Sequence, residues 1–249
     1  MKKNIILESL IKTYLNEHTP ISSGELKRKC DLTFSASTIR NYFQKLDEEG
    51  LIVKVHISSG RIPSKEAIKN YWYEHLKYDN IKLNKQKLSK YSKLFDVFIT
   101  IKEKQELKLS SILNVENKFI ILDFKTNEIV LKYSKELLQF FKEFLGYSFD
   151  DIKKLLKTLK FDSMLDKFNV SKVENFNKEF LYKNYKNFYI DKFLTDEIFT
   201  QFEYGLSFNK DYLAYKTDVL IDEKLNEFIL IGDIYNNYIN IFESIKEDI

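Results

Sequence analysis

The chain has 249 residues, of which 44% are hydrophobic and 31% charged, and its net charge is +3. This length predicts one or two domains with enough apolar material for a core, and 21 Phe with 16 Tyr exclude a disordered chain. The single cysteine, Cys30, excludes an internal disulfide and a cysteine-based zinc site, which fits a reducing, cytoplasmic environment. No apolar run approaches the roughly 18 residues of a membrane span, so no membrane insertion is expected.

The basic residues are unevenly distributed. Residues 1–78 hold 13 Lys and Arg against 9 Asp and Glu, whereas the remainder holds 27 against 28. All three arginines, Arg28, Arg40 and Arg61, lie in the first part, and elsewhere every basic position is lysine. We therefore expect the guanidinium fork to be needed in residues 1–78.

The first part reads as a short series of helices followed by a strand. Apolar residues at helical spacing predict a helix over 4–16, which Thr19-Pro20 ends. Ser22 or Ser23 can cap a second helix over 24–30, and Ser35 a third that runs to about Glu49 before Gly50. A strand at 51–55, a loop at 56–63 and a helix over 64–76 follow. This order is that of a winged helix-turn-helix domain at 1–78.

The remainder, 97–249, is predicted to form a second domain after a lysine-rich linker at 79–96. Strands are expected at 119–124 and 128–131, joined by a hairpin turn, and at 228–232. Ser134 and Ser148 each begin a helix, and a last helix runs to about 245. The fold class is therefore α+β.

The third helix is the candidate recognition helix. Arginine can pair with guanine and asparagine or glutamine with adenine, while the face of Ile39, Phe43 and Leu46 packs inward. Ser22 and Ser23 open the preceding helix, where hydroxyl and N–H groups can hold a phosphate. The loop ending in Arg61 can approach the DNA backbone or minor groove. The candidate DNA-binding residues are Ser22, Ser23, Ser35, Ser37, Thr38, Arg40, Asn41, Gln44, Lys45, His56, Ser58, Ser59, Gly60 and Arg61.

Each of these features also has a structural interpretation. Any amphipathic helix carries a solvated polar face, and the loop before Arg61 could be an ordinary hairpin tip. His56 could form a structural hydrogen bond instead of lying near a phosphate.

Three motifs stand in one order: S-A-S-T-I-R-N at 35–41, L-D-E-E-G-L at 46–51 and H-I-S-S-G-R-I-P at 56–63. With Tyr14 and P-I-S-S at 20–23, they resemble the heat-inducible transcription repressor family HrcA, which shows S-x-A-T-I-R-N, L-E-x-x-G-x-L and H-T-S-A-G-R-I-P-T. The chain departs from that pattern at Tyr42, where the family has an acidic residue, and at Ser59, where it has alanine.

The resemblance implies a GAF-like C-terminal domain with an inserted dimerisation segment, and repression of chaperone genes. It also implies that a chaperonin maintains the active fold and that heat abolishes it. A single winged helix contacts too few base pairs for genomic specificity, and symmetric dimers match palindromic sites, so we expect a homodimer on an inverted-repeat operator. We expect the dimerisation segment at about 147–200, where Leu155, Leu156 and Leu159 and a Phe-rich stretch offer apolar faces.

Other classes of function find less support. No P-loop, GxGxxG or HExxH motif is present, so neither an enzyme nor a cofactor or metal site is expected. An RNA-binding protein would need exposed aromatic residues for stacking, whereas the Phe and Tyr here follow helix and strand spacing. A ligand-sensing GAF-type regulator stays an alternative, although no ligand-binding motif is present.

Overall fold

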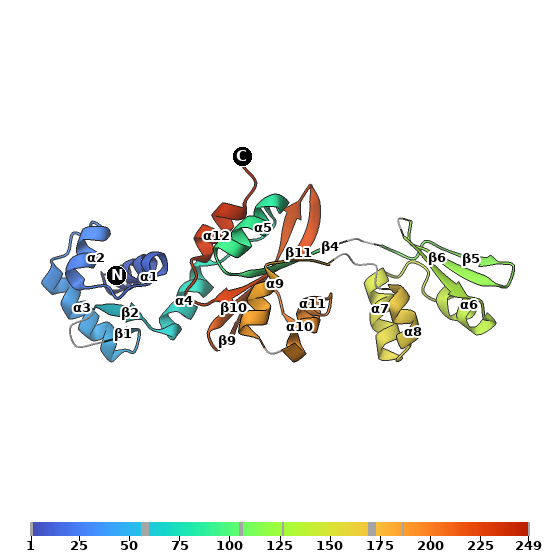
Figure 1. Ribbon diagram of the computed structural model, residues 1–249, viewed down its shortest axis with the longest axis horizontal. Helices are drawn as coiled ribbons and strands as arrows, with labels where there is room; N and C mark the ends of the chain where they lie inside the picture. Colours follow the sequence, from blue (N-terminus) through green and yellow to red (C-terminus); the bar gives the residue numbers. More distant parts are fainter. Residues whose placement is uncertain are drawn as a thin grey trace. The chain divides into compact units, whose positions relative to one another are not determined.

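The computed structural model describes residues 2–55, 60–104, 107–125, 127–168, 173–185 and 187–248, without the side chains of 187–189. Helices and strands are mixed along the chain, which confirms the α+β class. The chain divides into two compact units (Figure 1). The first unit comprises Met1–Lys102 and Val173–Ile249, and the second comprises Glu103–Lys172.

Three helices and a two-stranded hairpin begin the first unit: α1 (Lys2–Glu17), α2 (Ser23–Lys29), α3 (Ala36–Glu48), β1 (Ile52–Lys54) and β2 (Arg61–Pro63). Ser22 caps α2 and Ser35 caps α3, as predicted. Gly50 has a φ of 70°, which allows the chain to leave α3. These elements enclose a small core of apolar side chains: Ile6, Leu10, Ile21, Leu26, Ile39, Phe43, Leu46 and Ile52.

The stretch 56–63 is not a loop throughout, because Arg61–Pro63 forms β2. This strand pairs antiparallel with β1, with Lys54 opposite Arg61 and Ile52 opposite Pro63. Proline lacks an N–H group, and a three-residue strand that ends in proline gives no alternating pattern from which it could be predicted. Residues 56–59 lie outside the described part of the chain.

A mixed sheet forms the centre of the first unit, in the order β3 (Ile81–Lys82), β10 (Tyr212–Ile221), β11 (Lys224–Asp233), β4 (Phe98–Glu103) and β8 (Val173–Phe176). Strand β9 (Gly205–Asn209) also pairs with β10. Helices α4 (Lys65–His75), α5 (Lys85–Leu94) and α12 (Tyr238–Ile245) contribute to one core with this sheet. Helices α9 (Lys178–Asn184), α10 (Asn187–Phe193) and α11 (Ile198–Gln201) contribute to another on the opposite face (Figure 1).

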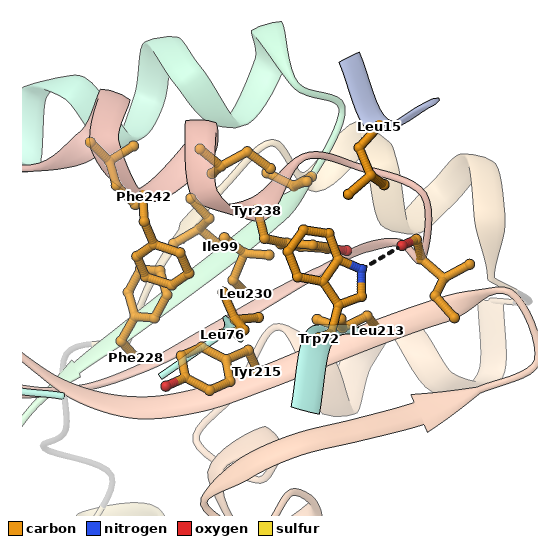
Figure 2. Packing of buried hydrophobic residues seen from close by; sticks show 14 of the residues in the cluster. Leu15, Trp72, Leu76, Ile99, Leu213, Tyr215, Phe228, Leu230, Tyr238 and Phe242 are labelled. Carbon is orange, nitrogen blue, oxygen red and sulfur yellow. Dashed lines mark hydrogen bonds between the residues drawn. The ribbon is translucent and has the colours of Figure 1, made fainter. Parts of the chain in front are cut away.

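Alternation along β11 separates these two cores. Phe228 and Leu230 join the core under α4, α5 and α12, where Trp72 is fully buried (Figure 2). Ile229 and Ile231 point to the core under α9–α11. A strand that is buried on both faces reads as a continuous apolar run, which is why 228–232 is recognisable from sequence.

The segment 79–96 differs from the predicted linker. It contains β3, which runs parallel to β10, and α5. Leu83 and Leu88 are buried in the larger core. Lysines cover the outer side of α5, so its composition resembles that of a linker although its inner side is packed.

The second unit contains an antiparallel sheet of β5 (Ser111–Val115), β6 (Phe119–Asp123) and β7 (Glu128–Lys132). Four helical segments follow: α6 (Lys135–Lys142), α7 (Phe149–Thr158), α8 (Asp162–Leu165) and the 3₁₀ helix η1 (Asp166–Phe168). Phe141 of α6 and Ile152 of α7 pack with Ile120 and Leu131 on one face of this sheet.

The second unit does not coincide with the dimerisation segment expected at 147–200. Residues from Val173 onward belong to the first unit, where Phe180, Phe193 and Phe199 are buried under its sheet. Leu156 is buried in the second unit, whereas Leu159 is exposed. Most of the apolar side chains expected to contact another subunit therefore pack within their own chain.

Candidate nucleic-acid interface

Helix α3 has a buried side and an exposed polar side. Ile39, Phe43 and Leu46 are buried. The opposite side exposes a set of polar residues: Ser37, Arg40, Asn41, Gln44 and Lys45. Among the described residues, Arg40 and Asn41 have no side-chain hydrogen bond or ion pair. Two adjacent side chains with base-reading chemistry are therefore free to bind a ligand.

Hydroxyl groups cluster at the start of α3. Ser35 Oγ accepts a hydrogen bond from the Thr38 N–H at 3.1 Å and lies 2.8 Å from both Ser37 Oγ and Thr38 Oγ1. Thr38 is half-buried, whereas Ser35 and Ser37 are exposed. The positive end of the helix dipole lies here, so an anion near this cluster would be stabilised.

Gln44 and Lys45 lie one turn further along α3 and have weak contacts. Gln44 Nε2 donates to Glu48 Oε1 at 3.1 Å, and Lys45 Nζ lies 5.8 Å from the centre of the Tyr42 ring. Both contacts are at the surface, so they can be exchanged for a ligand at small cost.

The two serines at the start of α2 have different environments. Ser22 is exposed and caps α2, with Glu25 completing a capping box, whereas Ser23 is only 9% exposed. A hydrogen bond from Lys29, together with one from the Ser22 N–H, holds the pKa of Glu25 below its ordinary value. The lowered pKa keeps Glu25 ionised, and so able to complete the cap, to a more acidic pH than an ordinary glutamate. Of the two serines, Ser22 is the one whose side chain a phosphate could reach.

The hairpin residues Gly60 and Arg61 lie against the loop between α1 and α2. A Cβ on Gly60 would stand 2.3 Å from the backbone carbon of Ile21, so only glycine fits there. Arg61 exchanges two backbone hydrogen bonds with Ile21, and its side chain forms an ion pair with Asp47. The motifs do not reveal that Ile21 and Asp47 hold this hairpin. His56, Ser58 and Ser59 lie outside the described residues.

Exposed basic residues lie on α3 and on the two elements packed beside it. These are Arg40 on α3, Lys27 and Arg28 on α2, and Lys54 on β1. In the part of the chain that the structure describes, no group of His, Cys, Asp and Glu has the arrangement of a metal site. None of the described helices is long and apolar enough to cross a membrane. The exposed basic side chains on α2, α3 and β1 are suited to binding a polyanion.

Comparison with known proteins gives the family. A family model described as the HrcA C-terminal domain matches residues 72–249. The heat-inducible transcription repressor HrcA of Helicobacter pylori (strain ATCC 700392 / 26695) is 29% identical over 253 residues, which cover 99% of this chain and 95% of that protein. The chain therefore belongs to the HrcA family.

Two further proteins are similar to this chain. The heat-inducible transcription repressor HrcA of Bacillus pumilus (strain SAFR-032) is 35% identical over 138 residues, covering 51% of this chain and 37% of that protein. A crystal structure of a hypothetical protein at 2.2 Å resolution aligns with a TM-score of 0.52 and 17% identity, covering 98% of this chain and 95% of that one. The second match concerns the fold alone.

Proposed function

We propose that this protein is a sequence-specific DNA-binding repressor of heat-shock genes. The pair Arg40 and Asn41 on α3, which is exposed and has no side-chain partner among the described residues, carries this proposal. In it, α1–α3 with the β1–β2 hairpin act as a winged helix-turn-helix, and α3 enters the major groove. The names of the relatives, heat-inducible transcription repressors, support the regulatory role. A chromosomal target places the protein in the cytoplasm.

Base recognition in this proposal falls to the exposed side of α3. Arg40 pairs with a guanine and Asn41 with an adenine, each adding about 1–3 kcal/mol of discrimination. Ser37, Gln44 and Lys45 flank them, while Ser22 and Ser35 contact the phosphates at the starts of α2 and α3. Half of a palindromic site is read by each subunit of a dimer.

We further propose that the second unit forms the homodimer through the outer face of its sheet. One face of β5–β7 packs on α6 and α7, whereas the other exposes a continuous group of apolar side chains. These are Leu113 (53% exposed), Val115 (38%), Phe119 (48%) and Val130 (47%), with Ile121 half-buried among them. An exposed apolar face of this kind on one side of a sheet is typical of an interaction surface.

The charges on that outer face favour a second copy as its occupant. Along β7 the outward side chains are Glu128, Val130 and Lys132, so one end of the face is acidic and the other basic. On the neighbouring strand β6, Asp123 lies opposite Glu128 at the acidic end, and Phe119 lies opposite Lys132 at the basic end. A two-fold axis across the strands at the level of Val130 would place the acidic end of one copy on the basic end of the other. The face is therefore complementary to itself.

Dependence on heat and on a chaperonin is part of the proposal. Phe228 and Ile231 are buried in the cores of the first unit. Partial unfolding would expose this apolar strand, which is the kind of surface that aggregates or that a chaperonin captures. A small-molecule effector bound in a GAF-like domain is the alternative signal.

Selection of bound duplexes from a random DNA pool, with a random RNA pool in parallel, tests the function. We expect enrichment of an inverted repeat and none of RNA. Enrichment of RNA alone would identify an RNA-binding regulator and contradict the proposal. Enrichment of a single, non-repeated site would contradict the dimeric recognition of DNA but leave DNA binding in place.

A further inference from the structure

The side chain of Arg61 faces the protein. Its Nη2 atom lies 3.5 Å from Oδ2 of Asp47, near the end of α3, and the side chain is 20% exposed. Its Nε atom is buried and has no hydrogen-bond partner among the described residues. The guanidinium is therefore directed at α3, in the kind of partly buried ion pair for which arginine is suited.

The backbone of Arg61 is held at the same time. Its N–H donates to the Ile21 oxygen at 2.8 Å, and the Ile21 N–H donates to the Arg61 oxygen at 2.9 Å. Gly60 passes so close to Ile21 that a Cβ would stand 2.3 Å from its backbone. The base of the hairpin therefore cannot move away without breaking both hydrogen bonds, so the backbone of Arg61 is held beside Ile21.

These contacts connect the two helices of the helix-turn-helix. Ile21 immediately precedes Ser22, the cap of α2. Asp47 is in the last turn of α3. Through its backbone Arg61 holds the start of α2, and through its guanidinium it holds the end of α3. The position of α3 relative to α2 decides how the exposed side of α3 meets the bases.

We infer that Arg61 is a positioning residue, which orients α3 through Asp47 and α2 through Ile21, and that it does not neutralise a DNA phosphate. This differs from the phosphate contact that the sequence suggests. The inference rests on the proposed function, because positioning matters only if α3 reads DNA. Asp47 gives the sharpest contrast between the two roles. If Arg61 binds a phosphate, Asp47 is an unpaired acid near DNA, and its removal should strengthen binding. If Asp47 is the partner that positions Arg61, its removal should weaken binding.

The experiment measures the affinity of the full chain for a duplex that carries the selected inverted repeat, between about 50 and 200 mM salt. The variants are Arg61→Ala, Asp47→Asn and the double variant. Lys54→Ala is the matched control, because Lys54 lies opposite Arg61 in the hairpin and is exposed. We expect each single variant to weaken binding about tenfold, as for the loss of one partly buried ion pair, with an unchanged salt slope. The double variant should be no worse than either single one, and Lys54→Ala should show no coupling to Asp47→Asn.

The opposite results would overturn the inference. These are a salt slope lowered by about one unit in Arg61→Ala, together with unchanged or tighter binding in Asp47→Asn. If Arg61→Ala does not fold, the affinity of Asp47→Asn decides between the two roles. Weaker binding supports positioning, and unchanged or tighter binding overturns it. If the wild-type chain selects no DNA, the proposed function fails, and the role of Arg61 in DNA reading fails with it. Thermal unfolding of the same variants then tests the structural part of the inference. Non-additive losses of stability would support the coupling of Arg61 to Asp47, and additive ones would overturn it.

Discussion

The indole Nε1 of Trp72 donates a hydrogen bond to the backbone oxygen of Ile234 at 2.9 Å (Figure 2). Trp72 is fully buried, and it packs in the same core as Leu15 of α1. Helix α1 contributes Ile6 and Leu10 to the core beneath α3 and Ile11 and Leu15 to the larger core. Helix α1 thus packs both against α2 and α3 and against the core of the central sheet, so melting of the sheet would remove support from α1.

This shared helix predicts that DNA binding and Trp72 fluorescence are lost together on heating. Trp72 is the only tryptophan, so its emission reports the folding of the larger core. The measurement follows emission and operator binding through one temperature ramp, with and without purified chaperonin, which we expect to restore both. Loss of binding well below the emission change, with no effect of chaperonin, would favour a small-molecule effector instead.

Substitution of Arg40 should lower the preference for the operator. Arg40→Ala removes the proposed guanine contact, worth about 1–3 kcal/mol, while leaving the neighbouring positive charge, so weak, salt-sensitive binding to random DNA should remain. Arg28→Ala, on the exposed surface of α2, is the control and should weaken both kinds of binding alike. Competition between operator and random duplexes measures the ratio of the affinities for the two kinds of DNA. A wild-type ratio in Arg40→Ala would show that Arg40 does not read bases.

Gly60 should tolerate no side chain. Gly60→Ala places a methyl group 2.3 Å from the Ile21 backbone, so either the hairpin shifts or its two hydrogen bonds break. We expect a loss of operator binding and a fall in the free energy of unfolding of about 1–3 kcal/mol. Gly24→Ala is the control, since no atom lies within 4 Å of its Cβ position in α2, and it should be neutral or slightly stabilising. Equal free energies of unfolding for the two variants in chemical denaturation would contradict the close approach of Gly60 to the Ile21 backbone.

The capping residues were predictable because caps are local. Ser22, Ser35, Ser64, Ser134 and Ser148 were all expected to begin helices, and each one accepts a hydrogen bond from the first turn of its helix. The amphipathic sides of α1 and α3 were predictable for the same reason, since their spacing is written within a few turns of sequence.

Strand β10 was not predictable, because polar residues interrupt its pattern. Lys216 is 5% exposed, and it is accommodated by an ion pair with Glu227 at 3.1 Å and by the Phe199 oxygen at 2.5 Å. Both partners are distant in the sequence. The clamp of Arg61 on Asp47 and Ile21 escaped prediction likewise, because it depends on three segments meeting in space.

Alkaline pH should destabilise the fold through Tyr71. Burial raises the pKa of Tyr71 to about 12 from its ordinary 10.0. Below pH 10 both the folded and the unfolded state keep this proton. Between pH 10 and about 12 only the unfolded state loses it, so stability falls as pH rises, by about 1.4 kcal/mol for each unit of pKa difference.

Tyr71→Phe should therefore flatten the fall in stability above pH 10, as measured by urea denaturation at pH 8 to 11.5. The control is Tyr73→Phe, whose side chain lies on the exposed side of the same helix and is 55% exposed. It should leave the fall unchanged. An identical decline in wild type and Tyr71→Phe would mean that another group causes it.

Charge exchange on the outer face of the second unit tests the dimer. In the proposed two-fold arrangement, Lys132 of one copy faces Glu128 of the other at both ends of the interface. Lys132→Glu should place like charges at both ends, as should Glu128→Lys, and each variant alone should dissociate more readily in light scattering. The same chain carrying both substitutions should dimerise again. An equimolar mixture of the two single variants should form heterodimers, because every facing pair is then of opposite charge.

Two further variants separate this arrangement from other dimers. Val130→Asp introduces a charge at the centre of the apolar face and should give a monomer, since exposed apolar area supplies most of the association energy. Lys154→Glu changes the same charge on α7, away from that face, and should leave the dimer intact. A dimer that survives Val130→Asp would place the interface elsewhere. Dissociation by both single charge variants without recovery in the doubly substituted chain would retain the sheet face but contradict a two-fold axis across its strands.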